Sequence, residues 1–104
     1  MLALFVASVA FAAAPDSPLE QGARAVEELR TDDAVRLLEA ARSGGPWNHP
    51  DHVRLYEQLA LAYAYQGQAA LARAAFERLL TIDPAHAIRY TLSPKVTFLF
   101  ESAR

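Results

Sequence analysis

Three histidines and an aspartate are the side chains in this sequence best suited to hold a metal ion. His49, Asp51 and His52 lie close together, and His86 follows further along the chain. Neutral imidazoles and a carboxylate form a ligand set that zinc accepts. However, His49 and His52 flank a proline where a helix is expected to begin, so their side chains should diverge. We therefore expect solvated or capping histidines, and neither a metal nor another cofactor.

Two pairs of adjacent carboxylates and one serine are the remaining candidates for catalysis. Glu27–Glu28 and Asp32–Asp33 are poor acid–base pairs, because adjacent residues on a helix do not face each other. Ser93 has no histidine evidently placed to activate its hydroxyl. The chain contains no cysteine, which excludes a thiol nucleophile, a disulfide and a thiolate metal site. With no convergent polar site, the sequence predicts a protein that is not an enzyme.

The size and charge of the chain narrow the choice of partners. Its 104 residues suit one small domain, and a hydrophobic fraction of 53% is enough to form a core. The formal net charge of -2 gives no electrostatic reason to expect nucleic acid or an acidic membrane surface as a partner. We therefore expect another protein or peptide as the partner, and no nucleic acid.

The first residues predict export. Leu2–Phe11 is a continuous apolar or small stretch, too short to cross a bilayer, which needs about 20 apolar residues. It fits a secretory signal, and Ala10-Phe11-Ala12 offers small residues at the positions that signal peptidase reads. We expect removal of residues 1–12, or less favourably of residues up to Ala14, and no stable membrane insertion afterwards. No Lys or Arg precedes the stretch, and a buried N-terminal helix is the alternative.

Helical spacing of apolar residues predicts two helices in the first half of the chain. The first follows Ser17 and Pro18, a capping serine and a first-turn proline. Thr31-Asp32-Asp33 interrupts the pattern and is expected to cap a second helix, which ends at Ser43-Gly44-Gly45-Pro46. The apolar stripes are formed by Leu19, Ala23, Val26 and Leu29 or Arg30 in the first helix and by Ala34, Leu37, Leu38 and Ala41 in the second.

Three further helices are expected. Asp51 is expected to cap the third, Gln66-Gly67-Gln68 to form a tight turn into a fourth over Ala69–Ile82, and Ser93-Pro94 to start the last. No segment alternates at period two, so no sheet is expected. The residues expected to face inward are Val53, Leu55, Tyr56, Leu59, Ala60, Ala62 and Tyr63, then Leu71, Ala72, Ala75, Phe76, Leu79 and Leu80, and finally Val96, Leu99, Phe100 and Ala103.

Residues 53–86 resemble a tetratricopeptide repeat, a helical hairpin of about 34 residues. Small residues such as Ala60 and Ala72 let two antiparallel helices approach closely, and we expect Tyr63 and Phe76 to be buried together beside them. Leu79 departs from the family, which favours alanine there. The matching positions are Tyr56, Leu59, Ala60, Tyr63, Gly67, Ala72, Phe76 and Pro84.

Residues 15–48 are similar to a degenerate earlier copy of the same repeat. Its matching residues are Gly22, Ala34, Leu38, Ala41 and Pro46. The resemblance implies an all-α fold of antiparallel tetratricopeptide-type hairpins, an alpha-alpha superhelix. Because a repeat array exposes the apolar flank of its final hairpin, we expect residues 93–104 to form a C-terminal capping helix. The alternative is that this helix docks on a partner or on a further domain. The segment from Leu92 onward, placed after this repeat, also resembles short exported tetratricopeptide-like proteins of myxobacteria and relatives.

The resemblance also implies a partner-binding face on the first helix of the hairpin. By matching positions, this face carries Arg54, Glu57, Leu61, Ala64 and Tyr65. Leu61 stands where family members that clamp acidic C-terminal tails have an asparagine, so that mode of binding is rejected. The alternative is that the last helix or the first hairpin covers this face.

Trp47 is an aromatic residue in an expected connector, with two interpretations. It packs under the Gly-Gly turn, or it anchors a partner.

These expectations favour a protein-interaction or scaffolding module in the bacterial periplasm or cell envelope. The alternative is a structural N-terminal segment of a longer envelope protein, or a piece that forms homo-oligomers, with no ligand of its own.

Overall fold

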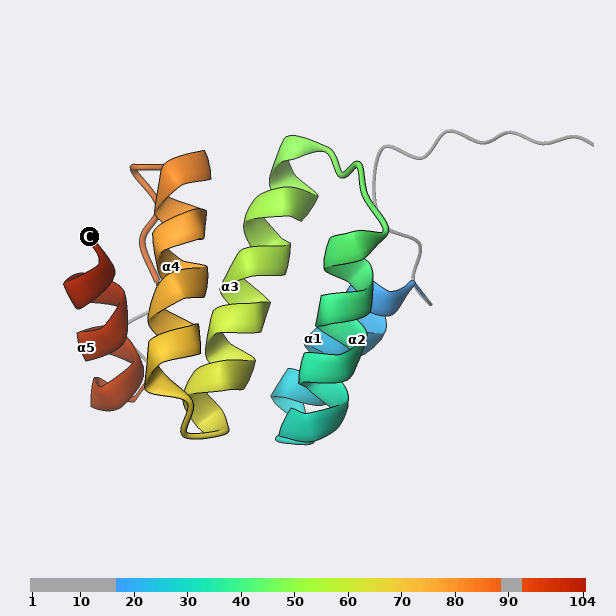
Figure 1. Cartoon of the computed structure of the whole chain (residues 1–104), viewed down its shortest axis with the longest axis horizontal. Helices are drawn as coiled ribbons and strands as arrows, with labels where there is room; N and C mark the ends of the chain where they lie inside the picture. The colour runs from blue at the N-terminus through green and yellow to red at the C-terminus, as the bar shows by residue number, and fades with distance from the viewer. Residues whose placement is uncertain (1–16, 89–92) are drawn as a thin grey trace, which may run out of the picture.

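The computed structural model describes residues 17–88 and 93–104 and places them in five α-helices (Figure 1). No described residue belongs to a strand, so the all-α prediction is confirmed. The expected signal over residues 1–12 lies outside the described residues. The helices are α1 (Pro18–Glu27), α2 (Thr31–Ser43), α3 (His49–Tyr65), α4 (Ala69–Ile82) and α5 (Pro94–Ala103).

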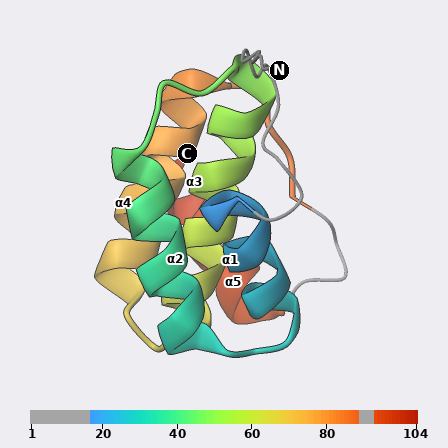
Figure 2. The same ribbon diagram turned by 90° about the vertical axis from the view of Figure 1, so that its right-hand side faces the viewer.

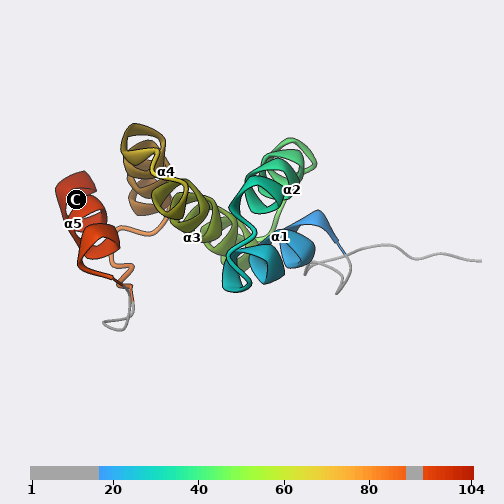
Figure 3. The ribbon, with the colours of Figure 1, turned by 90° about the horizontal axis from the view of Figure 1, so that it is seen from below.

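The helices pack in a row with α3 at its centre. α1 and α2 form one pair, which lies in front in the view of Figure 2, while α3 and α4 form an antiparallel second pair. Seen from below (Figure 3), α2 and α4 lie on one side of the row, α1 and α5 lie on the other, and α3 runs between them. Helix α3 contacts all four other helices, so most tertiary packing depends on it.

Two predicted helix starts are confirmed in detail. The Ser17 hydroxyl accepts a hydrogen bond from the backbone N–H of Glu20 at 3.3 Å, and the Ser93 hydroxyl accepts one from Val96 at 3.3 Å. A proline follows each serine at the first helical position, where the missing N–H costs nothing. These two helices therefore start as the local sequence dictates.

The other two predicted caps are wrong. Helix α3 starts at His49 because Asn48 precedes it and accepts from the backbone N–H of Asp51 at 2.9 Å, so Asp51 is the capped residue and not the cap. Helix α2 is preceded by Arg30 and has no side-chain cap. Thr31, Asp32 and Asp33, which were expected to cap α2, lie inside its first turn. There the negative charges of the two aspartates interact favourably with the positive end of the helix dipole.

The α1–α2 turn and the α3–α4 turn share one backbone geometry. Each contains a residue with positive φ, Leu29 at 58° and Gly67 at 84°. In each turn the N–H of this residue donates to the carbonyl three residues earlier, and the next N–H donates to the carbonyl five residues earlier. This is the hydrogen-bonding pattern of a helix end that closes through a left-handed residue.

One hydrophobic core runs through all five helices. The predicted stripes are largely confirmed, but Leu29 and Arg30 lie beyond the end of α1 and are exposed, so that end of the first stripe is wrong, and Leu71 is wrong as well. It is 45% exposed, because it lies one residue before the buried Ala72 and so points about 100° away around α4. The largest side chains that are almost fully buried are Leu19, Leu38, Leu55, Phe76, Leu79, Val96 and Phe100.

The expected buried pair of Tyr63 and Phe76 is only half correct. Phe76 is fully buried, and its ring meets the edge of Phe100 on α5 with ring centres 5.3 Å apart. Tyr63 is only partly buried, and its hydroxyl donates to the Glu39 carboxylate on α2 at 2.6 Å. Tyr63 thus ties α3 to the first helical pair, while Phe76 supports α5.

Candidate functional site

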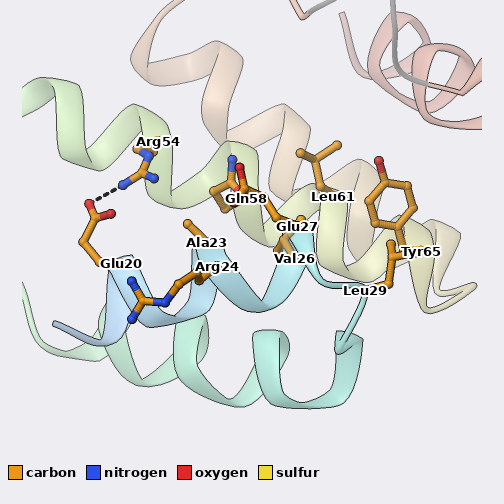
Figure 4. Close-up of a pocket in the computed structure, with 10 residues that line it drawn as sticks. All are labelled: Glu20, Ala23, Arg24, Val26, Glu27, Leu29, Arg54, Gln58, Leu61 and Tyr65. Carbon is orange, nitrogen blue, oxygen red and sulfur yellow. Dashed lines mark hydrogen bonds and ion pairs between the residues drawn. The ribbon is translucent and has the colours of Figure 1, made fainter. Parts of the chain in front are cut away.

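A cleft of about 430 Å³ lies between α1 and α3, and predicted partner-binding residues gather in it (Figure 4). It is formed where the two helical pairs meet, so neither pair would build it alone. The α1 side contributes Glu20, Ala23, Arg24, Val26, Glu27 and, just after the helix, Leu29, while the α3 side contributes Arg54, Gln58, Leu61 and Tyr65.

One end of the cleft is charged. The Arg54 guanidinium forms an ion pair with the Glu20 carboxylate across the gap between α3 and α1. Both side chains are partly exposed, so the pair contributes less to stability than a buried one would. Its main consequence is geometric, because it links the two helices at this end and holds both side chains along the rim (Figure 4).

The other end of the cleft is apolar. Leu61 is 4% exposed, while Tyr65 is 38% exposed and Leu29 is 67% exposed. Figure 4 shows these three side chains grouped at the same end, away from the Glu20–Arg54 pair. The cleft therefore offers hydrophobic contact at one end and polar contact at the other, an arrangement typical of sites that bind a partner non-covalently.

The structure brings three of the predicted α3 residues together and separates two. Arg54, Leu61 and Tyr65 line the cleft. Glu57 does not line it, and its carboxylate lies 3.4 Å from the Nε2 atom of His86, which follows α4. Ala64 is buried in the core and has no free surface for a partner. Glu57 and Ala64 do not border the cleft because other helices pack against several sides of α3, and only one stripe of α3 faces the cleft.

Trp47 lies away from the cleft and packs within the α2–α3 connector. Its indole Nε1 donates to the carbonyl of Ala41 at 2.9 Å, and its side chain packs against the core. A Cβ atom at Gly45 would lie 3.2 Å from the indole ring, so the glycine turn fits closely over it. These contacts favour the packing interpretation of Trp47 over the anchoring one.

Sequence reasoning missed the entire α1 side of the cleft. The signal was available, because the matched residues Gly22 and Ala60 are 38 residues apart. The same spacing pairs Ala23 with Leu61, and it pairs Glu20 and Glu27 with Gln58 and Tyr65, all of which line the cleft. Extending the candidate face from one expected repeat copy to the other would have found these residues.

Three of the four carboxylates considered for catalysis, Glu28, Asp32 and Asp33, have structural partners. Asp33 accepts hydrogen bonds from Arg36 at 3.2 Å and from Arg30 at 2.9 Å. Both bonds lower the pKa of Asp33, and the bond from Arg36 has the larger effect. Glu28 pairs with Arg30 at 2.9 Å, and Asp32 accepts from the Gln66 amide at 2.7 Å. These groups therefore organise the surface around the α1–α2 turn.

The histidines do not gather at one place. His49 is exposed, the His52 ring lies 5.3 Å from that of Tyr56, and His86 lies between Glu57 and Asp83. Over residues 17–88 and 93–104, no three of the histidine, aspartate and glutamate side chains are arranged to hold a metal ion.

A second cleft, of about 330 Å³, lies between α2, α3 and α4. Glu39 lines it and accepts both from the Tyr63 hydroxyl and from Arg42, whose guanidinium lies 2.6 Å away. Burial of the Tyr63 hydroxyl, together with its hydrogen bond to Glu39, raises the pKa of Tyr63 to about 12. The Arg78 guanidinium lies 5.8 Å from the centre of the Tyr56 ring. Much of the polar lining of this cleft is therefore engaged within the protein.

None of the described helices has the length and apolar character that crossing a membrane requires. Comparison of the chain with protein-family models, curated proteins and solved structures gives no match in any of the three.

Proposed function

We propose that this chain is a non-catalytic, tetratricopeptide-like module that binds a segment of another protein in the bacterial periplasm or cell envelope. The observation that carries the proposal is the cleft between α1 and α3, with its apolar end at Leu61 and Tyr65 and its charged end at Glu20 and Arg54. A partner segment would place apolar side chains at the first end and polar groups at the second.

The size and lining of the cleft support this proposal. A volume of about 430 Å³ accommodates a few side chains of a peptide but not a folded domain. Partly exposed aromatic residues are frequent anchors in protein interfaces, and Tyr65 lines this cleft while it remains 38% exposed. The order of the helices also supports it, because α1 contacts α3 and α3 contacts α5, as expected when hairpins stack in a repeat array.

Affinity capture with matched variants tests the binding site. The bait is the full chain, and Tyr65→Ala should lose the envelope proteins that the unchanged chain captures, because it removes an aromatic contact in the cleft. Phe98→Ala is the control, since Phe98 is an exposed aromatic residue on α5, outside the cleft lining. If both variants capture the same proteins as the unchanged chain, the cleft is not the binding site.

The proposed location is tested separately. Protein recovered from the envelope of its host should begin at Ala13, because residues 1–12 are expected to be removed during export. N-terminal sequencing measures this directly. Recovery of mature protein that still begins with Met1 would contradict export by this route, without bearing on whether the cleft binds a partner.

A further inference from the structure

Leu29 has a backbone conformation that glycine adopts far more easily. Its φ of 58° lies in the left-handed region, where the Cβ atom of an L-residue crowds the backbone. The equivalent position in the α3–α4 turn is occupied by Gly67, with the same hydrogen-bonding pattern around it. One repeat copy therefore uses the favoured residue, and the other retains a strained leucine.

The fold does not gain packing from this leucine. Leu29 is 67% exposed, so its side chain buries little apolar surface. The turn is held by its neighbour instead, because Arg30 pairs with Glu28 and with Asp33, at 2.9 Å in each case. These contacts involve the side chain of residue 30, and a glycine at position 29 would leave them in place.

The position of Leu29 gives the side chain a use outside the fold. It lies at the apolar end of the α1–α3 cleft, beside Tyr65 and Leu61 (Figure 4). Strained residues that persist without a structural benefit concentrate at sites of function. An exposed leucine beside a partly exposed tyrosine is also an apolar surface that a partner would cover.

The charges along α1 indicate what accompanies an apolar group in the cleft. Arg24 and Glu27 both line it and are exposed, and neither side chain forms an ion pair with another described residue. They lie three residues apart, so their opposite charges follow one another along a single helix face. The segment that complements them carries a basic group near Glu27 and an acidic group near Arg24.

We infer that Leu29 is the anchor of partner recognition: it contacts a large apolar side chain in a peptide segment of another protein, in which a basic and then an acidic side chain follow. This inference rests on the proposed function and specifies the chemistry of its ligand. It also implies that Leu29 makes the α1–α2 turn less stable than glycine would, and that its side chain makes a favourable contact only in the complex with the partner.

A reciprocal pair of variants tests the strain. Leu29→Gly should raise the melting temperature by about 3 °C, since the relief of strain exceeds the added freedom of glycine in the unfolded chain. Gly67→Leu should lower it by a similar amount, because a Cβ atom at Gly67 meets no atom within 4 Å and the cost is conformational alone. A lower melting temperature for Leu29→Gly would mean that the leucine supports the fold, and the inference would be overturned.

A titration of the full chain tests the contact. The probes are two capped synthetic hexapeptides that contain one phenylalanine, one lysine and one aspartate, in that order in one and in the reverse order in the other, because the cleft fixes the order of the groups but not the chain direction. Binding is followed by the amide chemical shifts of the protein in ¹H–¹⁵N spectra. The amides of Arg24, Glu27 and Tyr65 should shift on binding. Leu29→Gly should raise the dissociation constant about tenfold, as expected for loss of an anchoring residue. A probe with alanine in place of phenylalanine should show a similarly raised dissociation constant for the unchanged chain.

The matched control is Leu71→Ala, which removes another exposed leucine, on α4 and outside this cleft. It should leave the dissociation constant unchanged. Equal affinity of the unchanged chain and Leu29→Gly, or the failure of both probes to shift any amide of the cleft, would overturn the inference. The proposed function is judged apart from this, because loss of captured proteins with Tyr65→Ala would still locate a partner in the cleft.

Discussion

At the scale of single residues, the side-chain contact between α2 and α3 at Tyr63 depends on Glu39, which has two partners. Glu39 on α2 accepts from the Tyr63 hydroxyl on α3 and from Arg42 on its own helix. The local sequence gives no sign of the contact with Tyr63, because the two residues are far apart along the chain. The repeat pattern correctly places Tyr63 on an inner part of α3, but it cannot show that its hydroxyl reaches a carboxylate.

Tyr63 should make the stability of the protein fall at high pH. Burial, followed by the bond to Glu39, raises its pKa to about 12, from an ordinary value near 10. The unfolded chain then loses its phenolic proton first, so stability is fully present below pH 10 and is lost between about pH 10 and pH 12. Absorbance titration should show one tyrosine that ionises late, and Tyr63→Phe should abolish that step. A titration with no late-ionising tyrosine would contradict the burial of this hydroxyl.

At the scale of helices, α1 and α2 approach closely because Gly22 has no side chain. A Cβ atom built there would lie 2.6 Å from side-chain carbons of Leu38, which is itself fully buried. The correspondence of Gly22 with Ala60 indicated a small residue at this position, but only the packed pair of helices explains why even alanine is too large.

Gly22→Ala should therefore destabilise the protein, although alanine favours a helix more than glycine does. Overpacking against Leu38 costs about 1–3 kcal/mol, and the gain in helix propensity offsets up to about 1 kcal/mol of this. Denaturant melts should give a net loss of stability. Gly44→Ala is the control, because a Cβ atom there meets its nearest neighbours at an ordinary 3.5 Å. Stabilisation by Gly22→Ala would mean that α1 and α2 lie further apart than described.

Helix α5 is held to the rest of the molecule mainly by one face. Val96, Leu99 and Phe100 are buried on α4 and α3, as the helical spacing predicts, and the edge-to-face contact of Phe100 with Phe76 lies at the centre of this face. The spacing identified the face, while the choice of the α3–α4 pair as its partner follows from the apolar surface that this pair would otherwise leave exposed.

Phe100→Ala should cost about 3–5 kcal/mol of stability, the usual result of truncating a core aromatic residue. Phe98→Ala on the same helix should change stability by less than about 0.5 kcal/mol, because Phe98 is 70% exposed. Denaturant melts of the full chain compare the two. Similar small effects for both variants would show that α5 does not pack on the α3–α4 pair.

At the scale of the whole molecule, α3 connects everything else. It contacts α1, α2, α4 and α5, and it supplies buried residues from Leu55 to Ala64. The outer helices α1 and α5 each lack a helix on at least one side within the described residues. Stability should therefore fall from the centre of the row toward its ends.

Hydrogen exchange should reveal this gradient. The amides of Leu59 to Ala62 should exchange slowest, because opening them requires separation of α3 from its neighbours. The amides of Leu99 to Ala103 should exchange faster, though still more slowly than those of an unfolded peptide. Equal protection across the chain would show that it unfolds as one unit, and unprotected amides in α5 would show that this helix is not docked.

The sequence by itself determined the number of helices, most of their boundaries and most of their buried faces, because these depend on residues close together in the chain. Ser17, Gly67 and Ser93 act within a few residues of their own positions, so local chemistry sets the helix ends that they form. Asn48 was missed as the cap of α3 because Asp51, three residues later, is also of a type that caps helices. Only the folded backbone shows that Asn48 accepts the hydrogen bond and that Asp51 donates it.

The repeat spacing would have pointed to Glu20, but only the tertiary structure decided which of these faces form a site. The α1–α3 cleft exists only because two helical pairs pack side by side, and the packing removes Glu57 and Ala64 from the expected face while it adds Glu20 and Leu29. Such contacts join residues that are distant in sequence, and the spacing within one helix carries no information about them. Leu29 illustrates the limit, because its strain and its exposure become visible only once the turn around it is folded.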